Sequence, residues 1–209
     1  MVYKIGLLGT HGTGKTLLSY GVAEKLGIRK DIDLSVRVIG ELATVARERA
    51  IPIDQQTTLE AQAWILARQI ATELEAEIYK YDVAICDRTV LDNYCYMANK
   101  IGPRENYLKL VLGHCKSHPY SKLYFLPITE RLNPKKRDAD PEFQKAIDQK
   151  IRLFLAEHSI DYITLLHDRR SWKKIIVEQT VEDLKELEKK KEQERLVGMT
   201  KWGKPFPSD

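Results

Sequence analysis

The segment best suited to chemistry lies near the start of the chain, where Gly9-Thr10-His11-Gly12-Thr13-Gly14-Lys15-Thr16 follows a short apolar run. Its spacing, G-x-x-x-x-G-K-[ST], matches a phosphate-binding loop, which requires a strand before it and a helix after it. Glycines allow successive backbone amides to curl around an anion, and the helix that begins there presents its positive end to the same anion. Lys15 is expected to reach the β- and γ-phosphates of a nucleoside triphosphate, and the Thr16 hydroxyl is expected to hold Mg²⁺.

The predicted nucleotide-contacting residues form one run through this loop and into the helix that follows. They are Gly9, Thr10, His11, Gly12, Thr13, Gly14, Lys15, Thr16 and Leu17. The alternative is a chance glycine-rich turn, and the apolar run before the loop and the helical pattern after it argue against that alternative. The sequence therefore predicts a protein that binds a nucleoside triphosphate.

A second acidic position follows the apolar run Val83–Cys86. Asp87 at the end of this run is expected to hold the magnesium ion through water. The next residue is Arg88, at a position where ATPases that activate water often carry a glutamate. Arginine stays protonated and cannot act as a base, but it can grip a second anion or a transferring phosphoryl group. The pattern favours transfer to another molecule over hydrolysis; the alternative is a structural arginine that caps carbonyls or pairs with Asp92.

Transfer to a hydroxyl needs a base beside the acceptor. Glu41 directly follows the apolar run Val36–Ile39 and Gly40, and it is the predicted general base. The alternative is an acidic residue at a helix start, which the helix dipole favours without any catalytic role.

A basic cluster lies in the segment PITERLNPKKRDADPEFQ. Arg131 and Arg137 are the predicted catalytic arginines of a loop that closes over the phosphates, because a guanidinium matches phosphoryl oxygens bidentately. The alternative is a basic surface loop whose charges pair with Asp138 and Asp140.

The elements that must position these residues alternate along the chain. Strands are expected at Tyr3–Leu8, Val36–Ile39, Val83–Cys86, Leu123–Leu126 and Tyr162–Leu166, and helices at Lys15–Leu26, Gln55–Lys80, a broken region from Leu91 to Cys115, and Pro141–His158. This order predicts an α/β fold with a doubly wound, mostly parallel five-stranded sheet and helices on both faces. The carboxyl ends of its strands, where ligands collect in such folds, carry Gly9, Glu41 and Asp87.

The long helix from Gln55 has two distinct faces. Leu59, Ala63, Leu66, Ile70 and Leu74 form a stripe that is expected to face the core. Thr58, Gln62, Ile65 and Gln69 form a face of more polar character.

Composition limits the remaining classes. The chain has 209 residues, 43% of them hydrophobic, and a formal charge of +4, which suits one globular domain and a polyphosphate ligand. Nucleic acid is not expected as a partner, since it more often brings a strongly basic face. Three unpaired cysteines and the lack of a long apolar run indicate a cytoplasmic protein with no membrane span.

The C-terminal part of the chain differs from the rest. The run EDLKELEKKKEQER predicts a charged helix, so the chain is divided into a nucleotide-binding domain over residues 1–180 and a helical extension with an irregular tail over 181–209. The extension is either a solvated continuation of the last helix or an arm that binds a second copy or another protein.

Together, GTHGTGKT, the glutamate in VIGELATVARE, the DRTVLDNYCY run and the basic PKKRDADPE loop resemble the P-loop nucleoside-kinase family. The nearest likeness is to its nicotinamide-riboside-kinase-like ATPase domains, with deoxynucleoside kinases more distant. The resemblance implies ATP and Mg²⁺ as cofactors, Lys15, Thr16 and Asp87 around the phosphates, and Glu41 and Arg88 near an acceptor hydroxyl. It also implies that the loop from Arg131 to Asp140 is a lid.

The sequence therefore predicts a Mg-ATP-dependent kinase that acts on a small nucleoside-like or riboside-like acceptor. Transfer onto a nucleotide phosphate belongs to the same class and would not need Glu41 as a base. A regulatory or assembly ATPase that works through the C-terminal helix is the main alternative, and a polynucleotide 5′-end kinase is a weaker one because the net charge is modest.

Overall fold

The fold is an α/β sandwich built on one parallel sheet. The computed structural model describes residues 2–53, 56–128, 141–166 and 168–201. The strands are β1 (Tyr3–Leu8), β2 (Val36–Ile39), β3 (Val83–Asp87), β4 (Lys122–Phe125) and β5 (Ile163–Thr164). The helices are α1 (Lys15–Gly27), α2 (Leu42–Glu48), α3 (Leu59–Ile78), α4 (Val90–Ile101), α5 (Glu105–Ser117), α6 (Pro141–Glu157) and α7 (Arg169–Lys201).

The sheet has the strand order β2-β3-β1-β4-β5, and every neighbouring pair is parallel. The central strand β1 is therefore flanked by β3 and β4. Its six residues are all buried, as expected for a parallel strand that is covered on both faces. The predicted five-stranded α/β fold is confirmed.

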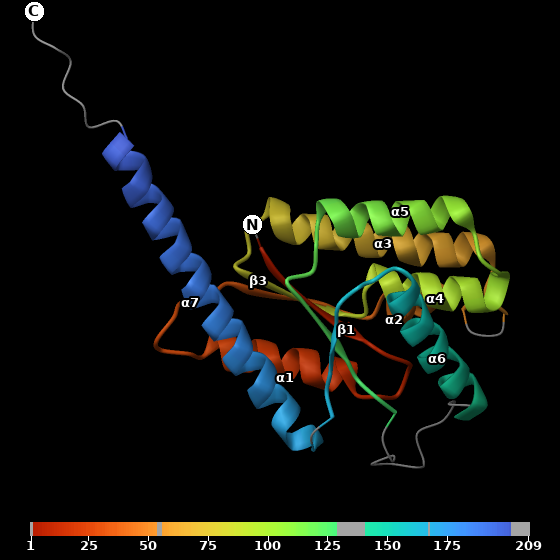
Figure 1. The fold of residues 1–209 in the computed structure, drawn as a ribbon. Helices are drawn as coiled ribbons and strands as arrows, with labels where there is room; N and C mark the ends of the chain where they lie inside the picture. Colours follow the sequence, from red (N-terminus) through yellow and green to blue (C-terminus); the bar gives the residue numbers. More distant parts are fainter. Residues whose placement is uncertain (1, 54–55, 129–140, 167, 202–209) are drawn as a thin grey trace, which may run out of the picture.

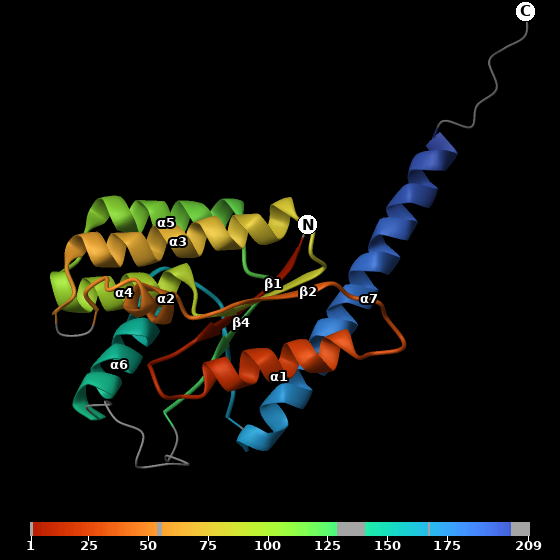
Figure 2. The same cartoon turned by 180° about the vertical axis from the view of Figure 1, so that it is seen from behind.

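Helices cover both faces of this sheet (Figures 1 and 2). One core lies between the strands and α1 with α7, where Leu18, Leu26, Trp172 and Ile176 are buried. The other core joins the opposite face to the layer of α3, α4, α5 and α6. Sequence segments far apart are thereby brought to one edge, because parallel strands end on the same side.

Several element boundaries differ from the predicted ones for local reasons. β5 is only two residues long, Ile163–Thr164, because it is an edge strand that pairs with β4 alone. The helix expected from Gln55 begins at Leu59, where the Thr58 side chain accepts a hydrogen bond from the backbone amide of Ala61 (3.3 Å) and caps the helix.

The last helix, α7, is a single continuous helix across the predicted domain boundary at residue 180. Its packed part reaches beyond this boundary, because Val181 is buried in the core and Leu184 packs against it. From Lys185 to Arg195 the side chains are exposed, and this part of α7 projects away from the sheet (Figure 1). Within the described ranges, no helical segment combines the length and the hydropathy that a membrane span requires.

Candidate functional site

The loop between β1 and α1 has the backbone shape that its glycines permit. Gly9 and Gly14 adopt φ values of 135° and 93°, which side chains rarely tolerate. A Cβ at Gly9 would lie 2.7 Å from the carbonyl oxygen of Leu126, and one at Gly14 would lie 2.4 Å from Arg169 Nη2. The loop is therefore packed closely on both sides, and its curled shape depends on glycine at these two positions.

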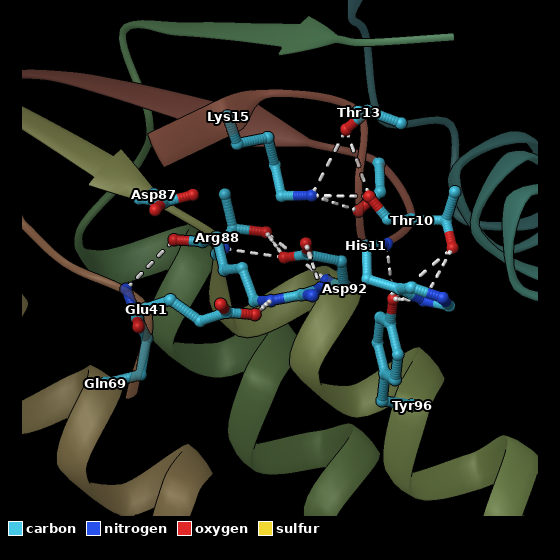
Figure 3. A network of polar contacts seen from close by, with 12 residues as sticks. Thr10, His11, Thr13, Lys15, Glu41, Gln69, Asp87, Arg88, Asp92 and Tyr96 are labelled. Carbon is cyan, nitrogen blue, oxygen red and sulfur yellow. Dashed lines mark hydrogen bonds and ion pairs between the residues drawn. The ribbon is translucent and has the colours of Figure 1, made fainter. Parts of the chain in front are cut away.

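Lys15 is buried at the centre of this loop (Figure 3). Its ammonium donates hydrogen bonds to the carbonyl oxygens of Gly9 (2.8 Å) and Thr10 (2.6 Å), and it lies 3.4 Å from Thr13 Oγ1. Burial and the nearby Arg88 charge lower the pKa of Lys15 to about 8. The loop thus holds a cation where the motif requires one.

Thr16 and Asp87 join the first turn of α1 to the end of β3. The Thr16 hydroxyl donates to Asp87 Oδ2 over 2.5 Å. Burial raises the pKa of Asp87, although the Thr16 hydrogen bond and the Lys15 charge act in the opposite direction. Two oxygen ligands at one point suit Mg²⁺, which prefers oxygen donors and completes its shell with phosphates and water. The described residues contain no cluster of three or more His, Cys, Asp or Glu side chains that would form a metal site of another kind.

Arg88 and Glu41 form an ion pair beside Asp87 (Figure 3). Arg88 Nε donates to Glu41 Oε1 over 2.6 Å, and the Arg88 guanidinium lies 4.5 Å from the centre of the Tyr96 ring. Arg88 Nη1 is 3.6 Å from Asp92 Oδ2. The predicted structural alternative for Arg88, a pair with Asp92, is thus present in addition to the pair with Glu41.

The position of Glu41 bears on its two predicted roles, a general base or an acidic residue at a helix start. Glu41 is the residue that precedes α2, but its side chain makes no capping hydrogen bond there and turns to Arg88 instead. The Arg88 charge lowers the pKa of Glu41, and burial opposes this effect only in part. The carboxylate is therefore ionised at neutral pH, and its partner is the arginine that follows the predicted magnesium ligand.

Three residues outside the predicted set hold the phosphate loop in place. The backbone amide of His11 donates to Tyr96 Oη (2.9 Å), and Gln144 Nε2 donates to the His11 carbonyl (2.8 Å). Arg169 donates to the carbonyl of Thr13. Tyr96 has a sequence signal, because it lies four residues after Asp92 and shares its face of α4. Gln144 and Arg169 have none, since only the fold brings α6 and α7 to the loop.

The predicted site residues fall into three groups. Arg131 and Arg137 lie outside the described residues. Leu17 is on the first turn of α1 with an 81% exposed side chain. The remaining predicted residues, from Gly9 to Thr16 with Glu41, Asp87 and Arg88, lie at the carboxyl edge of the sheet.

Comparison with known proteins gives a family and a fold. A protein-family model described as an AAA domain matches residues 4–174. No curated protein matches the chain.

Among solved structures, a NadR protein in complex with NAD and AMP-PNP is similar with a TM-score of 0.64 and 15% identity, covering 87% of this chain and 49% of that chain. This chain thus spans about half the length of the NadR protein. A deoxyadenosine kinase from M. mycoides has a TM-score of 0.56 and 16% identity, covering 88% and 99% of the two chains. A thymidylate kinase from Ehrlichia chaffeensis has a TM-score of 0.60 and 14% identity, covering 88% and 98%. At these identities the likeness shows the fold alone, which this chain shares with the NadR protein and the two kinases.

Proposed function

Since the chain belongs to the AAA domain family, we propose that it is a Mg-ATP-dependent kinase that transfers the γ-phosphate of ATP to a hydroxyl of a small nucleoside-like or riboside-like acceptor. One observation carries this proposal. The Glu41–Arg88 pair lies beside Asp87, the hydrogen-bond partner of Thr16, so a carboxylate and a guanidinium lie close to the place where the phosphate loop would present a γ-phosphate.

The donor side of the site is formed by the loop and its lysine. Its backbone amides and the N-terminus of α1 bind the β-phosphate, and Lys15 exchanges its bonds to the Gly9 and Thr10 carbonyls for phosphate oxygens. A magnesium ion, held by Thr16 Oγ1 and through water by Asp87, would neutralise charge on the β- and γ-phosphates.

The acceptor side supplies the base. The acceptor oxygen forms a bond to the γ-phosphorus while the bond from that phosphorus to the bridging oxygen breaks, and ADP leaves with this electron pair. The acceptor proton passes to Glu41, whose lowered pKa keeps it ionised before the reaction. A weak base suffices because the transition state of phosphoryl transfer is loose and the proton leaves late.

Arg88 supplies positive charge where negative charge develops. It is 5% exposed, and its Nη1 atom is buried without a hydrogen-bond partner among the described residues. A buried, preoriented guanidinium stabilises a transferring phosphoryl group with little reorganisation. That Arg131 and Arg137 of the predicted lid stabilise the same developing negative charge remains a prediction.

The solved structures indicate which acceptors to test first. The NadR protein has also been solved with NR, and the deoxyadenosine kinase with dCMP as a product. An acceptor panel for this chain therefore starts with nicotinamide riboside and the deoxynucleosides, and includes thymidine monophosphate.

The decisive experiment measures ADP release from Mg-ATP with and without each acceptor, for the wild type and Glu41→Gln. Acceptor-stimulated turnover is expected, and it should fall about 10²- to 10⁴-fold in the variant, as general-base loss predicts. Stimulation by thymidine monophosphate that survives in Glu41→Gln would instead assign transfer onto a phosphate. Turnover that no acceptor stimulates would refute the kinase proposal.

A regulatory or assembly ATPase is the second candidate, and the exposed stretch of α7 from Lys185 to Arg195 favours it. In that case basal ATP hydrolysis would be insensitive to every acceptor and would respond to a protein partner. Removal of this stretch would abolish that response while nucleotide binding persists.

A further inference from the structure

The turn that carries Arg88 has an unusual backbone. Arg88 adopts φ 92°, a region that residues with a side chain rarely occupy unless their surroundings hold them there. This backbone directs the guanidinium to Glu41 and Tyr96. The contacts that hold the turn therefore determine where the arginine points.

Two hydrogen bonds fix the peptide group between Arg88 and Thr89. Gln69 Nε2 donates to the carbonyl oxygen of Arg88 over 3.1 Å (Figure 3), and the amide of Thr89 donates to Asp92 Oδ1 over 2.6 Å. The first bond comes from another helix, α3, whereas the second belongs to the capping box that begins α4. The peptide plane is thus held from both sides, and only the Gln69 bond depends on tertiary packing.

A third bond holds the next residue along the turn. The amide of Val90 donates to Tyr120 Oη over 3.1 Å. Tyr120 Oη in turn donates to Glu73 Oε1 over 2.6 Å, and Gln69 Nε2 donates to the same oxygen over 2.9 Å. Both residues that reach into the turn are therefore anchored on one carboxylate.

This carboxylate lies at the centre of a buried polar cluster. Glu73 is fully buried, and its second oxygen accepts from Lys4 Nζ (2.9 Å) and His114 Nε2 (3.0 Å). Burial alone would raise the pKa of Glu73, but the His114 bond and the Lys4 charge outweigh it and lower the pKa. Glu73 is thus a carboxylate with four donors from Lys4, Gln69, His114 and Tyr120.

The amide of Gln69 has only one reasonable orientation. Its two neighbours, the Glu73 carboxylate and the Arg88 carbonyl, both accept hydrogen bonds, so the NH₂ group must face them and use both of its protons. A flipped amide would place its oxygen against two acceptors. Gln69 therefore connects the cluster to the turn with a fixed geometry.

Stability does not account well for such a cluster. Buried ion pairs often contribute no more than well-packed apolar residues of the same volume, because removing charges from water is costly. This one connects β1, α3, α5 and the segment before β4, and besides the bond from Lys4 Nζ to the His118 carbonyl oxygen it sends two hydrogen bonds to the turn after β3, from Gln69 and Tyr120. Its specific effect is on the geometry of that turn.

We propose that Gln69 and Tyr120, anchored on the buried Glu73 carboxylate, are positioning residues that hold the turn from Arg88 to Val90 and so direct the Arg88 guanidinium into the active site. The effect of this positioning on catalysis rests on the proposed kinase function, whereas the positioning of Arg88 does not. Neither residue reaches the reacting atoms; both act through Arg88.

The test measures Arg88 directly. In nitrogen–proton correlation spectra of the full chain without nucleotide, the Arg88 Nε–H signal is assigned by its loss in Arg88→Lys, and its hydrogen-exchange rate is recorded. Gln69→Met and Tyr120→Phe each remove one bond to the turn with little change of volume. Exchange of the Arg88 Nε–H is expected to become about three- to tenfold faster in each variant, as loss of one hydrogen bond predicts.

Matched controls use the same residue types elsewhere. Gln62 lies on the same helix and donates to Thr57 Oγ1 (2.8 Å), and Tyr124 Oη donates to Gln179 (2.7 Å). Gln62→Met and Tyr124→Phe should leave the Arg88 exchange rate unchanged. An equal acceleration in these controls, or an unchanged rate in both Gln69→Met and Tyr120→Phe, would overturn the proposal. If Gln69→Met does not fold, Tyr120→Phe alone decides.

Kinetics separate this proposal from the function. With an acceptor that the wild type phosphorylates, kcat should fall about three- to thirtyfold in Gln69→Met, while KM for Mg-ATP stays within about twofold. Where no acceptor is phosphorylated, the kinase proposal fails but the exchange measurement still decides the positioning role. Faster exchange with an unchanged kcat would refute the catalytic consequence alone.

Discussion

Lys15 is only partly charged in mildly alkaline solution, because burial and the Arg88 charge lower its pKa to about 8. A bound polyphosphate favours the ammonium form and raises this pKa again. Magnesium-free ATP should therefore bind with uptake of about half a proton at pH 8, and its affinity should fall as the pH rises further. Isothermal titration calorimetry in phosphate and in Tris, which differ in ionisation enthalpy, measures the uptake.

The matched control for this measurement is Lys15→Arg, which keeps the positive charge at every accessible pH. Its binding heat should be the same in both buffers once dilution is subtracted. Equal heats for the wild type at pH 8 would show that Lys15 is fully protonated before the nucleotide arrives.

Acceptor-dependent turnover is expected to depend on the planar guanidinium of Arg88. In Arg88→Lys the single ammonium cannot contact Glu41 and a phosphoryl group in the same bidentate way. Acceptor-dependent kcat should fall about 10²- to 10³-fold, as removal of an electrostatic contact to the transition state predicts. Steady-state kinetics with the acceptor that the wild type uses measures this effect.

The conservative change Arg49→Lys provides the comparison for Arg88→Lys. Arg49 is an exposed residue at the end of α2, and its guanidinium carbon lies 5.8 Å from the centre of the Trp64 ring. Its substitution should leave kcat within about twofold. An Arg88→Lys enzyme as active as Arg49→Lys would remove Arg88 from the mechanism.

At this scale the sequence alone predicts a compact group of donor-side residues, because the phosphate loop is a local motif. Thr16 and Asp87 are 71 positions apart and form a hydrogen bond, as their shared predicted metal would require. The contact between Glu41 and Arg88 follows less directly, from the rule that parallel strands end on one edge. The Glu73 cluster has no signal in the sequence, since its members come from separate elements without a common spacing.

Among the elements, α3 shows how packing overrides periodicity. The stripe predicted to face the core includes Leu66, which is buried, but Gln69 and Glu73 of the other faces are buried as well. Hydrophobicity cannot distinguish this arrangement, because the polar partners come from other elements: Glu73 accepts from Lys4 and His114, and Gln69 donates to the Arg88 carbonyl. The predicted faces of this helix are therefore only partly right, and the difference is the cluster that supports Arg88.

The unit formed by β1, the phosphate loop and α1 depends on glycine to different degrees along its length. An alanine at position 9 would place its Cβ 2.7 Å from the Leu126 carbonyl oxygen, and its backbone would have to adopt φ 135°. A Cβ at position 27 would meet nothing within 4 Å. Gly9→Ala should lower the free energy of unfolding by about 1–3 kcal/mol. Gly27→Ala should raise it by up to about 1 kcal/mol through helix propensity.

Urea denaturation of the two alanine variants measures both effects in the same helix–strand unit. The sign of the difference is the critical result, because both substitutions add one methyl group. Equal effects would show that the loop relaxes freely away from β4.

For the molecule as a whole, α7 has two parts with different energetic roles. Residues up to Leu184 pack on the sheet, where Val181 is buried and Asp183 accepts from the Tyr3 hydroxyl. Truncation after Thr180 removes these contacts and should lower the free energy of unfolding by about 2–4 kcal/mol. Truncation after Glu188 removes only exposed residues of the described part and should change it by less than about 0.5 kcal/mol.

Thermal unfolding of the two truncated chains tests this division and the predicted boundary at residue 180 together. A chain ending at Thr180 that is as stable as the full chain would favour the boundary predicted from the charge pattern. A destabilised chain would move the boundary past Leu184, the last partly buried residue that packs on this core.

The projecting end of α7 also determines how the protein moves through solvent. The whole helix of 33 residues is about 50 Å long, at about 1.5 Å per residue, and its part beyond Leu184 extends past the packed domain (Figure 1). The particle is therefore elongated, and it sediments more slowly and elutes earlier than a sphere of equal mass. An apparent mass read from gel filtration against globular standards will be too high, so a monomer can be mistaken for a dimer unless light scattering determines the mass.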